Sequence, residues 1–107
     1  MRPLWDALYQ YGADLVVVGH EHVYERFAPQ RPDGSADPAT GIRQFTVGTG
    51  GAGVYAFGTL LPNSESRGTS RGVIKLTLRD GGYDWKFVPI AGESFTDGGT
   101  GACHGPP

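Results

Sequence analysis

The residues with the clearest chemical potential in this sequence are two histidines that stand two positions apart, His20 and His22. A neutral imidazole is a good nitrogen ligand for a transition metal near pH 7. Gly19 precedes the pair and permits the sharp turn and the close approach that a metal site requires. The spacing therefore predicts a divalent metal site at His20 and His22, and two solvated or hydrogen-bonded loop histidines are the alternative.

Two histidines alone leave such a site incomplete, since a catalytic zinc site usually has three protein ligands and a water. Glu21 and His104 are the further candidate ligands, and the carboxylates of Glu25 and Asp97 could also fold back onto the pair. A second copy of the chain could instead bring its own two histidines to a twofold axis. Cys103 and His104 form a separate zinc-binding hypothesis, and an exposed tail with an unpaired thiol is the alternative to it.

The histidine pair follows an expected helix, turn and strand. Residues 3–11 predict a helix that Gly12 ends, because apolar side chains recur there at helical spacing. The apolar stripe, which is expected to face the core, consists of Leu4, Trp5, Leu8 and Tyr9. Residues 14–19 contain a short, continuous apolar run with three β-branched valines and predict a strand that is buried on both faces. The histidines come at the carboxyl end of this strand, where open α/β sheets bind ligands.

The rest of the chain predicts mainly antiparallel β-structure. Residues 43–47 form an expected strand, and the glycine-rich run 48–53 is expected to be a tight turn, with backbone donors near a phosphate as the alternative. Residues 28–41 and 63–72 contain turn-forming residues and are expected to be loops. The residues from 92 onward are rich in Gly, Thr and Ser and are expected to lie extended on the surface.

A hairpin over residues 73–89 is predicted by the turn signal Asp80-Gly81-Gly82. The side chains expected to alternate toward one face are Ile74, Leu76 and Leu78, which point to the core, and Tyr83, Trp85, Phe87 and Pro89 on the return strand. The fold class is therefore α/β (α+β), with a short N-terminal helix, one buried strand and then mainly antiparallel strands.

Composition argues against several classes of function. The 107 residues include 18 Gly and 8 Pro and carry a net charge of −2, which argues against a nucleic-acid surface. No apolar run approaches the roughly 20 residues of a membrane span. No signal-peptide pattern begins the sequence, and the compartment is not indicated. One cysteine excludes an intramolecular disulfide. A glycine-rich chain of this size needs help from a partner chain, a metal or a missing portion of a larger domain.

Residues 15–26 resemble the last metal-binding motif of the calcineurin-like metallophosphoesterases. The resemblance is to the purple acid phosphatase-like branch, whose members often have Gly-His-x-His-x-Tyr-Glu-Arg at this point. The motif in this chain is Gly19-His20-Glu21-His22-Val23-Tyr24-Glu25-Arg26. The resemblance continues in the strand and glycine turn at 45–51, the hairpin at 73–89 and the tail at 97–104, so it covers nearly the whole chain.

The resemblance implies a two-layer β-sandwich flanked by helices, in which two metal ions bridged by a hydroxide hydrolyse phosphate esters. It implies that His20 ligates one metal and that His22 ligates the other. Tyr24, Glu25 and Arg26 would support the loop, with Glu25 and Arg26 paired. Arg26 is also a candidate substrate-binding residue.

Other motifs of that family are absent from this sequence. It has no Asp-x-His, no Gly-Asp followed by a second Asp ligand, no Asn-His pair and no further upstream His ligand. The chain therefore resembles the C-terminal third to quarter of a family member, as a single partial domain over residues 1–107. We expect self-association, with a dimer favoured, because dimerisation would cover the apolar face that the absent part leaves bare.

These features lead to one functional hypothesis and two alternatives. The hypothesis is a metal-dependent phosphoesterase with zinc, manganese or iron, in which a metal-activated hydroxide attacks phosphorus in line with the leaving group. Phosphodiesters are favoured over monoesters because the nearby cations are few, namely Arg26 and Arg43. The expected partners are a small phosphate-ester substrate and a second copy, without nucleic acid or membrane. The alternatives are a non-catalytic fragment and a chain whose missing half is supplied by a separate chain.

Overall fold

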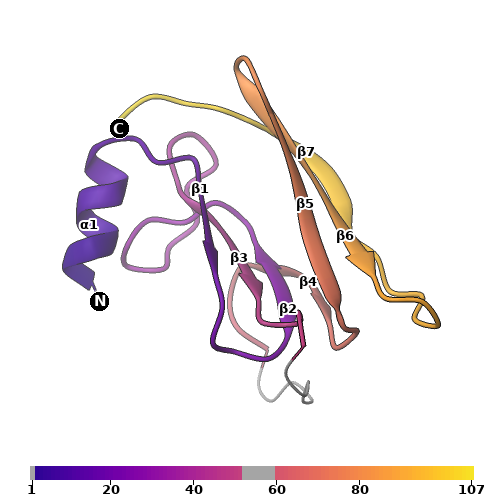
Figure 1. Cartoon of the computed structure of the whole chain (residues 1–107). Helices are drawn as coiled ribbons and strands as arrows, with labels where there is room; N and C mark the ends of the chain where they lie inside the picture. Colours follow the sequence, from indigo (N-terminus) through magenta and orange to yellow (C-terminus); the bar gives the residue numbers. More distant parts are fainter. Residues whose placement is uncertain (1, 52–59) are drawn as a thin grey trace.

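The computed structural model describes residues 2–51 and 60–107, and this part of the chain forms one short helix and seven strands in two sheets (Figure 1). In chain order they are α1 (Arg2–Gln10), β1 (Leu15–Val18), β2 (Tyr24–Phe27), β3 (Arg43–Val47), β4 (Ser64–Gly68), β5 (Gly72–Arg79), β6 (Gly82–Pro89) and β7 (Gly98–Ala102). The first sheet has the order β1-β3-β2-β4 and the second has the order β5-β6-β7. β1 and β3 are parallel, and all other paired strands are antiparallel, which confirms the prediction of mainly antiparallel structure.

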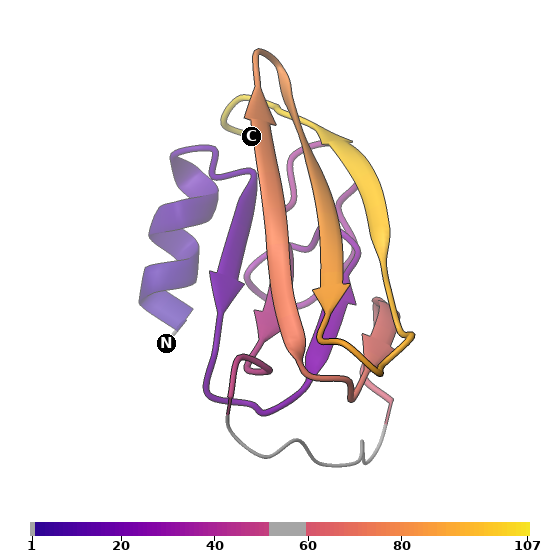
Figure 2. The same ribbon diagram turned by 45° about the vertical axis from the view of Figure 1, so that its right-hand side comes forward.

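The core lies between the two sheets, which form two layers in Figures 1 and 2. Tyr24 and Phe45 of the first sheet meet the aromatic residues of β6, with ring centroids 4.8 Å apart for Tyr24 and Phe87 and 5.4 Å apart for Phe45 and Trp85. The alternation predicted for β6 is confirmed, because Tyr83, Trp85 and Phe87 are all buried. Offset and edge-on ring contacts of this kind stabilise a core beyond the area that they bury.

The helix at the N-terminus forms as predicted, but it does not bury its apolar stripe. Gly12 has a φ of 80°, and its amide donates to the carbonyl of Tyr9 at 3.1 Å, which ends α1 with a left-handed cap. Trp5, Leu8 and Tyr9 are half-buried and Leu4 is 51% exposed, and no residue of α1 packs against the core cluster, so the prediction that the stripe faces the core is wrong. The reason is that α1 stands to the side of β1 and does not lie across the core (Figures 1 and 2).

The prediction of a strand within residues 14–19 is confirmed, but its burial on both faces is wrong. Val17 is 43% exposed, and the other residues of β1 are half-buried. β1 pairs only with β3 among the described residues, which makes it an edge strand of the first sheet. A continuous apolar run identifies a strand, but it does not reveal whether both neighbouring strands are present.

The predicted hairpin is present, and Gly81 takes a φ of 77° in its turn. Ile74 and Leu76 pack against the core as expected. Leu78 is 75% exposed, so its predicted burial is wrong. Leu78 pairs across the hairpin with the buried Tyr83, but it lies on β5, which has only β6 as a neighbour among the described strands. At this sheet edge Leu78 lines an open pocket together with Leu15, and it therefore stays exposed.

Three strands lie in places where the sequence predicts loops or an extended tail. β2 carries the residues that were expected to support the histidine loop. Part of the predicted loop 63–72 is β4, a polar edge strand of the first sheet whose sequence has no alternation of apolar residues to indicate a strand. The tail is extended as predicted, but it also pairs with β6 as β7. Residues 28–41 form the predicted loop, and no helix within the described residues is long and apolar enough to cross a membrane.

Candidate functional site

The two histidines lie in the short connection between β1 and β2, at the carboxyl end of β1. Because β1 and β3 are parallel, the carboxyl end of β3 comes to the same edge of the sheet, and Gly48 follows it there. This is the position that the sequence predicts for the histidine pair. We call residues 19–23 the histidine turn.

The backbone of the histidine turn is unusually tight. The amide of Glu21 donates to the carbonyl of Gly19 at 2.9 Å, and the amide of Val23 donates to the carbonyl of Glu21 at 2.8 Å. Each is a three-residue γ-turn, with His20 at the centre of the first and His22 at the centre of the second. His20 has a φ of 75°, which a residue with a side chain adopts at a cost of about 1–3 kcal/mol.

Gly48, which follows β3, supports the histidine turn by close contact with its backbone. A methyl group at position 48 would overlap the carbonyl oxygen of Glu21 and press on the Cα of His22. The amide of Gly48 donates to the carbonyl of Val23 at 3.1 Å. The glycine is therefore required by this close approach, and its amide is already used, so it is not a donor for a phosphate. Residues 52 and 53 of the predicted glycine turn lie outside the described residues.

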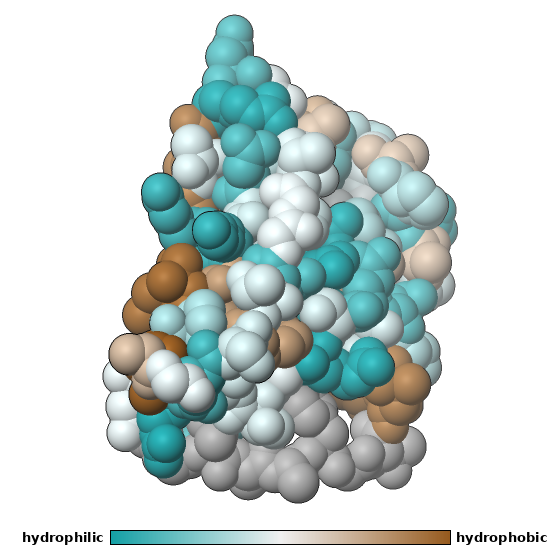
Figure 3. All heavy atoms as spheres, turned by 90° about the vertical axis from the view of Figure 1, so that its right-hand side faces the viewer, coloured by the Kyte–Doolittle hydropathy of each residue, from teal (hydrophilic) through white to brown (hydrophobic). Residues whose placement is uncertain are grey.

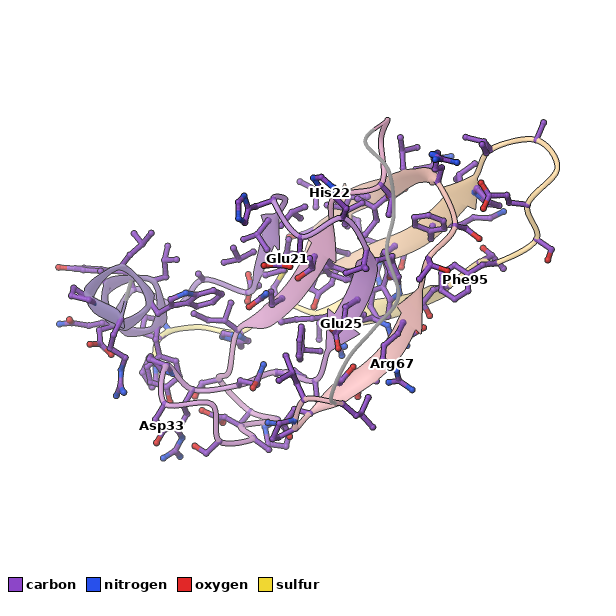
Figure 4. All side chains as sticks on the ribbon, turned by 90° about the horizontal axis from the view of Figure 1, so that it is seen from below. Glu21, His22, Glu25, Asp33, Arg67 and Phe95 are labelled. Carbon is purple, nitrogen blue, oxygen red and sulfur yellow. The ribbon has the colours of Figure 1, made fainter. Side chains whose placement is uncertain are left out.

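The side chains of the histidine turn differ in exposure. His20 and Glu21 are exposed, and His22 is half-buried. Figure 4 shows Glu21 and His22 near each other and far from Asp33. Two imidazoles are suitable donors for zinc, manganese or iron, but they are fewer than a closed or a catalytic site needs. Within residues 2–51 and 60–107, no group of three or more His, Cys, Asp or Glu side chains could hold a metal ion.

His104, a further candidate ligand, is held at the other end of β1. Its amide donates to the carboxylate of Asp14 at 2.8 Å, and Asp14 immediately precedes β1. Its Nε2 lies 2.9 Å from the carbonyl oxygen of Gly41, and its Nδ1 lies 2.9 Å from that of Gly105. The structure therefore does not bring His104 to the histidine turn. Loss of solvation and the Asp14 carboxylate raise the pKa of the Cys103 thiol, which disfavours the thiolate that zinc would need.

The two carboxylates that could have folded back onto the histidines have other partners. Glu25 is buried, and its Oε2 accepts a hydrogen bond from the Ser64 hydroxyl at 2.5 Å. Figure 4 shows Glu25 beside Arg67, its cross-strand neighbour on β4. The expected pairing of Glu25 with Arg26 is wrong, because adjacent residues of a strand point to opposite faces of the sheet.

Asp97 lies between the sheets, where its carboxylate accepts four hydrogen bonds. The donors are the Tyr24 hydroxyl at 2.5 Å, Arg26 Nε at 2.8 Å, Arg26 Nη2 at 3.1 Å and Trp85 Nε1 at 3.2 Å. Burial raises the pKa of Asp97, but the hydrogen bonds from Arg26 and Tyr24 outweigh it and leave that pKa lowered. Burial and the Asp97 carboxylate raise the pKa of the Tyr24 hydroxyl, which keeps it a donor.

Arg26, the candidate substrate-binding residue, is committed to the interior. Besides Asp97 it contacts Glu65, which also accepts a hydrogen bond from Arg43 Nη1 at 2.7 Å. The guanidinium carbons of Arg26 and Arg43 lie 5.1 and 4.8 Å from the centroid of the Trp85 ring. These contacts favour a structural role for both arginines. Sequence reasoning missed this cluster, although Tyr24 and Arg26 share one strand face and need a buried acceptor there.

Comparison with known proteins gives one distant relation. No family model and no solved structure matches the chain. The chain is 33% identical over 89 residues to a protein of Arabidopsis thaliana named "Probable inactive purple acid phosphatase 1". The match covers 75% of this chain and spans only 14% of that relative's length. The similarity thus links the chain, at a distance, to the purple acid phosphatase-like proteins and through them to the metallophosphoesterases.

Proposed function

We propose that this chain carries the two-histidine segment of a metal-dependent phosphoesterase site. His20 and His22 are the metal ligands, and zinc, manganese or iron is the metal. The observation that carries the proposal is the geometry of the histidine turn, in which two successive γ-turns on a glycine support hold both histidines at the carboxyl end of two parallel strands. The two layers of sheet would then be part of a metallophosphoesterase β-sandwich.

A hydrolytic site needs more ligands than the histidine turn supplies. Since no third ligand joins the pair within the described part of the chain, we propose that a second copy completes the site. The face seen in Figure 3 has separated apolar patches among hydrophilic residues. The open edge at β1, where Val17 is 43% exposed, is the better candidate for the contact between copies.

The substrate class follows from the cations that remain. A bound metal would supply a water of lowered pKa as the nucleophile. Arg26 and Arg43 are both engaged by Glu65, so neither is left to neutralise the second negative charge of a phosphate monoester. A phosphodiester, which carries one negative charge, is therefore the proposed substrate.

A catalytically silent segment is the second candidate. Two observations favour it: the described residues contain no three-ligand cluster, and the relative that matches is itself named inactive. Such a chain would keep the fold and bind a metal weakly through two imidazoles, or not at all.

The test is hydrolysis of bis(4-nitrophenyl) phosphate by the purified chain, first stripped of metal and then supplied with zinc or manganese. His22→Ala is the test variant, and His104→Ala is the control, because His104 lies at the opposite end of β1. Metal-dependent turnover that His22→Ala abolishes and His104→Ala preserves would support the phosphoesterase. Light scattering with and without zinc would show whether active material is dimeric. If the chain is folded but shows no turnover with either metal, the phosphoesterase is excluded and the catalytically silent segment is the remaining candidate.

A further inference from the structure

We propose that Asp97 is a positioning residue that fixes the histidine turn from the opposite layer of the molecule. The inference rests on the proposed function, because the turn matters there as a pair of metal ligands. The observation behind it is that one largely buried carboxylate, Asp97, joins the strand that follows the turn to the second sheet.

Among the described residues, two of the three side chains that donate to Asp97 lie on β2, directly after the histidine turn. Tyr24 and Arg26 follow His22 by two and four positions, and together they make three hydrogen bonds to Asp97 of 2.5, 2.8 and 3.1 Å. The third donor, Trp85, lies on β6 and binds the same carboxylate at 3.2 Å. The Asp97 side chain is 9% exposed, so these bonds are largely protected from water.

Tyr24, the first residue of β2, is also held in place by packing. Tyr24 is fully buried, and its ring lies 4.8 Å from that of Phe87 and 5.7 Å from that of Phe95. Phe95 stands two positions before Asp97, so one segment both covers the Tyr24 ring and binds its hydroxyl. The start of β2 therefore cannot shift without breaking contacts to the second sheet.

Val23, a buried residue, connects the fixed Tyr24 to the histidine turn. Val23 is 5% exposed and lies between His22 and Tyr24. Its carbonyl accepts from Gly48, and its amide closes the γ-turn around His22. With Tyr24 fixed on one side and Gly48 on the other, the backbone of His22 has one arrangement. Because the strained φ of His20 persists only where its surroundings hold it, Asp97 is the anchor whose loss would relax the turn.

Asp37 provides a matched control in another part of the fold. It is a buried aspartate, 6% exposed, and like Asp97 it accepts a hydrogen bond from a tyrosine, here Tyr9 at 2.7 Å. Thr40 donates to it as well, through its amide at 3.1 Å and its hydroxyl at 3.0 Å. These partners belong to the helix and to the 28–41 loop, not to the histidine turn or β2.

The experiment compares Asp97→Asn with Asp37→Asn in the full chain. Without metal, amide hydrogen exchange is measured by NMR at Glu21, Val23 and Gly48, together with the imidazole chemical shifts. With metal, zinc affinity is measured by competition with a coloured chelator. We expect Asp97→Asn to speed exchange at the three amides and to weaken zinc binding about tenfold or more, in the range seen when the support of a metal ligand is removed. Asp37→Asn should change neither beyond its effect on global stability.

A second pair of variants keeps the inference testable if Asp97→Asn does not fold. Tyr24→Phe and Trp85→Phe each remove one hydrogen bond to Asp97, but only Tyr24 lies on β2. We expect Tyr24→Phe to loosen the turn more than Trp85→Phe. The inference would be overturned if amide exchange at the histidine turn were equal in Asp97→Asn and Asp37→Asn, or in Tyr24→Phe and Trp85→Phe. A wild-type chain that binds no zinc would refute the proposed function alone, since the metal-free exchange data would still decide the role of Asp97.

Discussion

The interior between the sheets and the histidine turn are adjacent in the chain, yet they are held in opposite ways. Between the sheets, Tyr24 is fully buried, and the polar groups of Tyr24 and Arg26 have close partners. A few residues earlier, His20 is exposed and has a strained backbone. The difference shows that the turn does not hold the fold together. Its geometry is imposed by the interior, which is the arrangement expected of a functional site.

The largest expected effect comes from the interior. Phe45 is fully buried and packs on Trp85, so Phe45→Ala should lower the free energy of unfolding by about 3–5 kcal/mol. A small domain is stable by only about 5–15 kcal/mol, so much of the protein's stability would be lost. Urea unfolding followed by tryptophan fluorescence measures the change.

Leu78→Ala is the matched control for that prediction. Leu78 is apolar but 75% exposed at the projecting end of the hairpin, so its truncation should change stability by less than about 0.5 kcal/mol. Similar losses in the two variants would mean that the end of the hairpin is covered in solution, for example by a second copy.

Gly48→Ala tests the contact between the two regions. The added methyl group overlaps the carbonyl of Glu21, so we expect a loss of about 1–3 kcal/mol and altered NMR signals from the histidine turn. Gly50→Ala is the control, since a methyl group at position 50 meets nothing within 4 Å. A Gly48→Ala protein as stable as Gly50→Ala would show that the turn can move away from β3, and that it is less constrained than we describe.

Acid should weaken the interior through Asp97. Burial raises its pKa, but the bonds from Arg26 and Tyr24 outweigh this and lower it, so the folded chain binds fewer protons than the unfolded chain. The contribution to stability is fully present above the unfolded pKa of about 3.9 and is lost as the pH falls through the folded pKa. Urea midpoints between pH 7 and pH 3 should therefore decrease more for the wild type than for Asp97→Asn. Parallel decreases would assign the acid sensitivity to other carboxylates.

The sequence predicts the elements of the interior better than their surroundings. Alternating Tyr83, Trp85 and Phe87 specify one face of β6, and the structure buries all three. Leu78 continues the same apolar face across the hairpin, beside Tyr83, but it lies on the edge strand β5 and stays exposed. The apolar run of β1 likewise lacks any mark of an edge strand. Periodicity records which face of a strand is apolar, but it does not record whether the strand lies at the edge of its sheet.

For the candidate site, too, the sequence predicts what depends on neighbouring residues and misses what depends on distant ones. The spacing of His20 and His22 locates the turn, because it depends on residues that are local in the chain. The role of Asp97 depends on contacts with residues 71 and 73 positions away, Arg26 and Tyr24, and an aspartate in a Gly-rich tail gives no local sign of them. The close approach of Gly48 to Glu21 is equally non-local. From the sequence, a glycine after a strand indicates only a turn. In the structure, Gly48 is required because the backbone of Glu21 lies too close for any side chain.

The smallest expected effect separates the two histidines themselves. Glycine adopts a φ of 75° without strain, so His20→Gly should recover part of the roughly 1–3 kcal/mol stored there, offset by about 0.5–1 kcal/mol of added chain entropy. His22 has no positive φ, so His22→Gly should only destabilise, by about 0.5–1 kcal/mol or more.

The two glycine variants should therefore differ in stability while both lose zinc affinity. Urea unfolding and zinc competition on the same samples separate these effects. If His20→Gly is more stable than His22→Gly and binds zinc more weakly than the wild type, the strained backbone at position 20 serves metal binding and not the stability of the fold. If His20→Gly is instead as destabilised as His22→Gly, the turn is part of what stabilises the interior, and the contrast between the two regions fails.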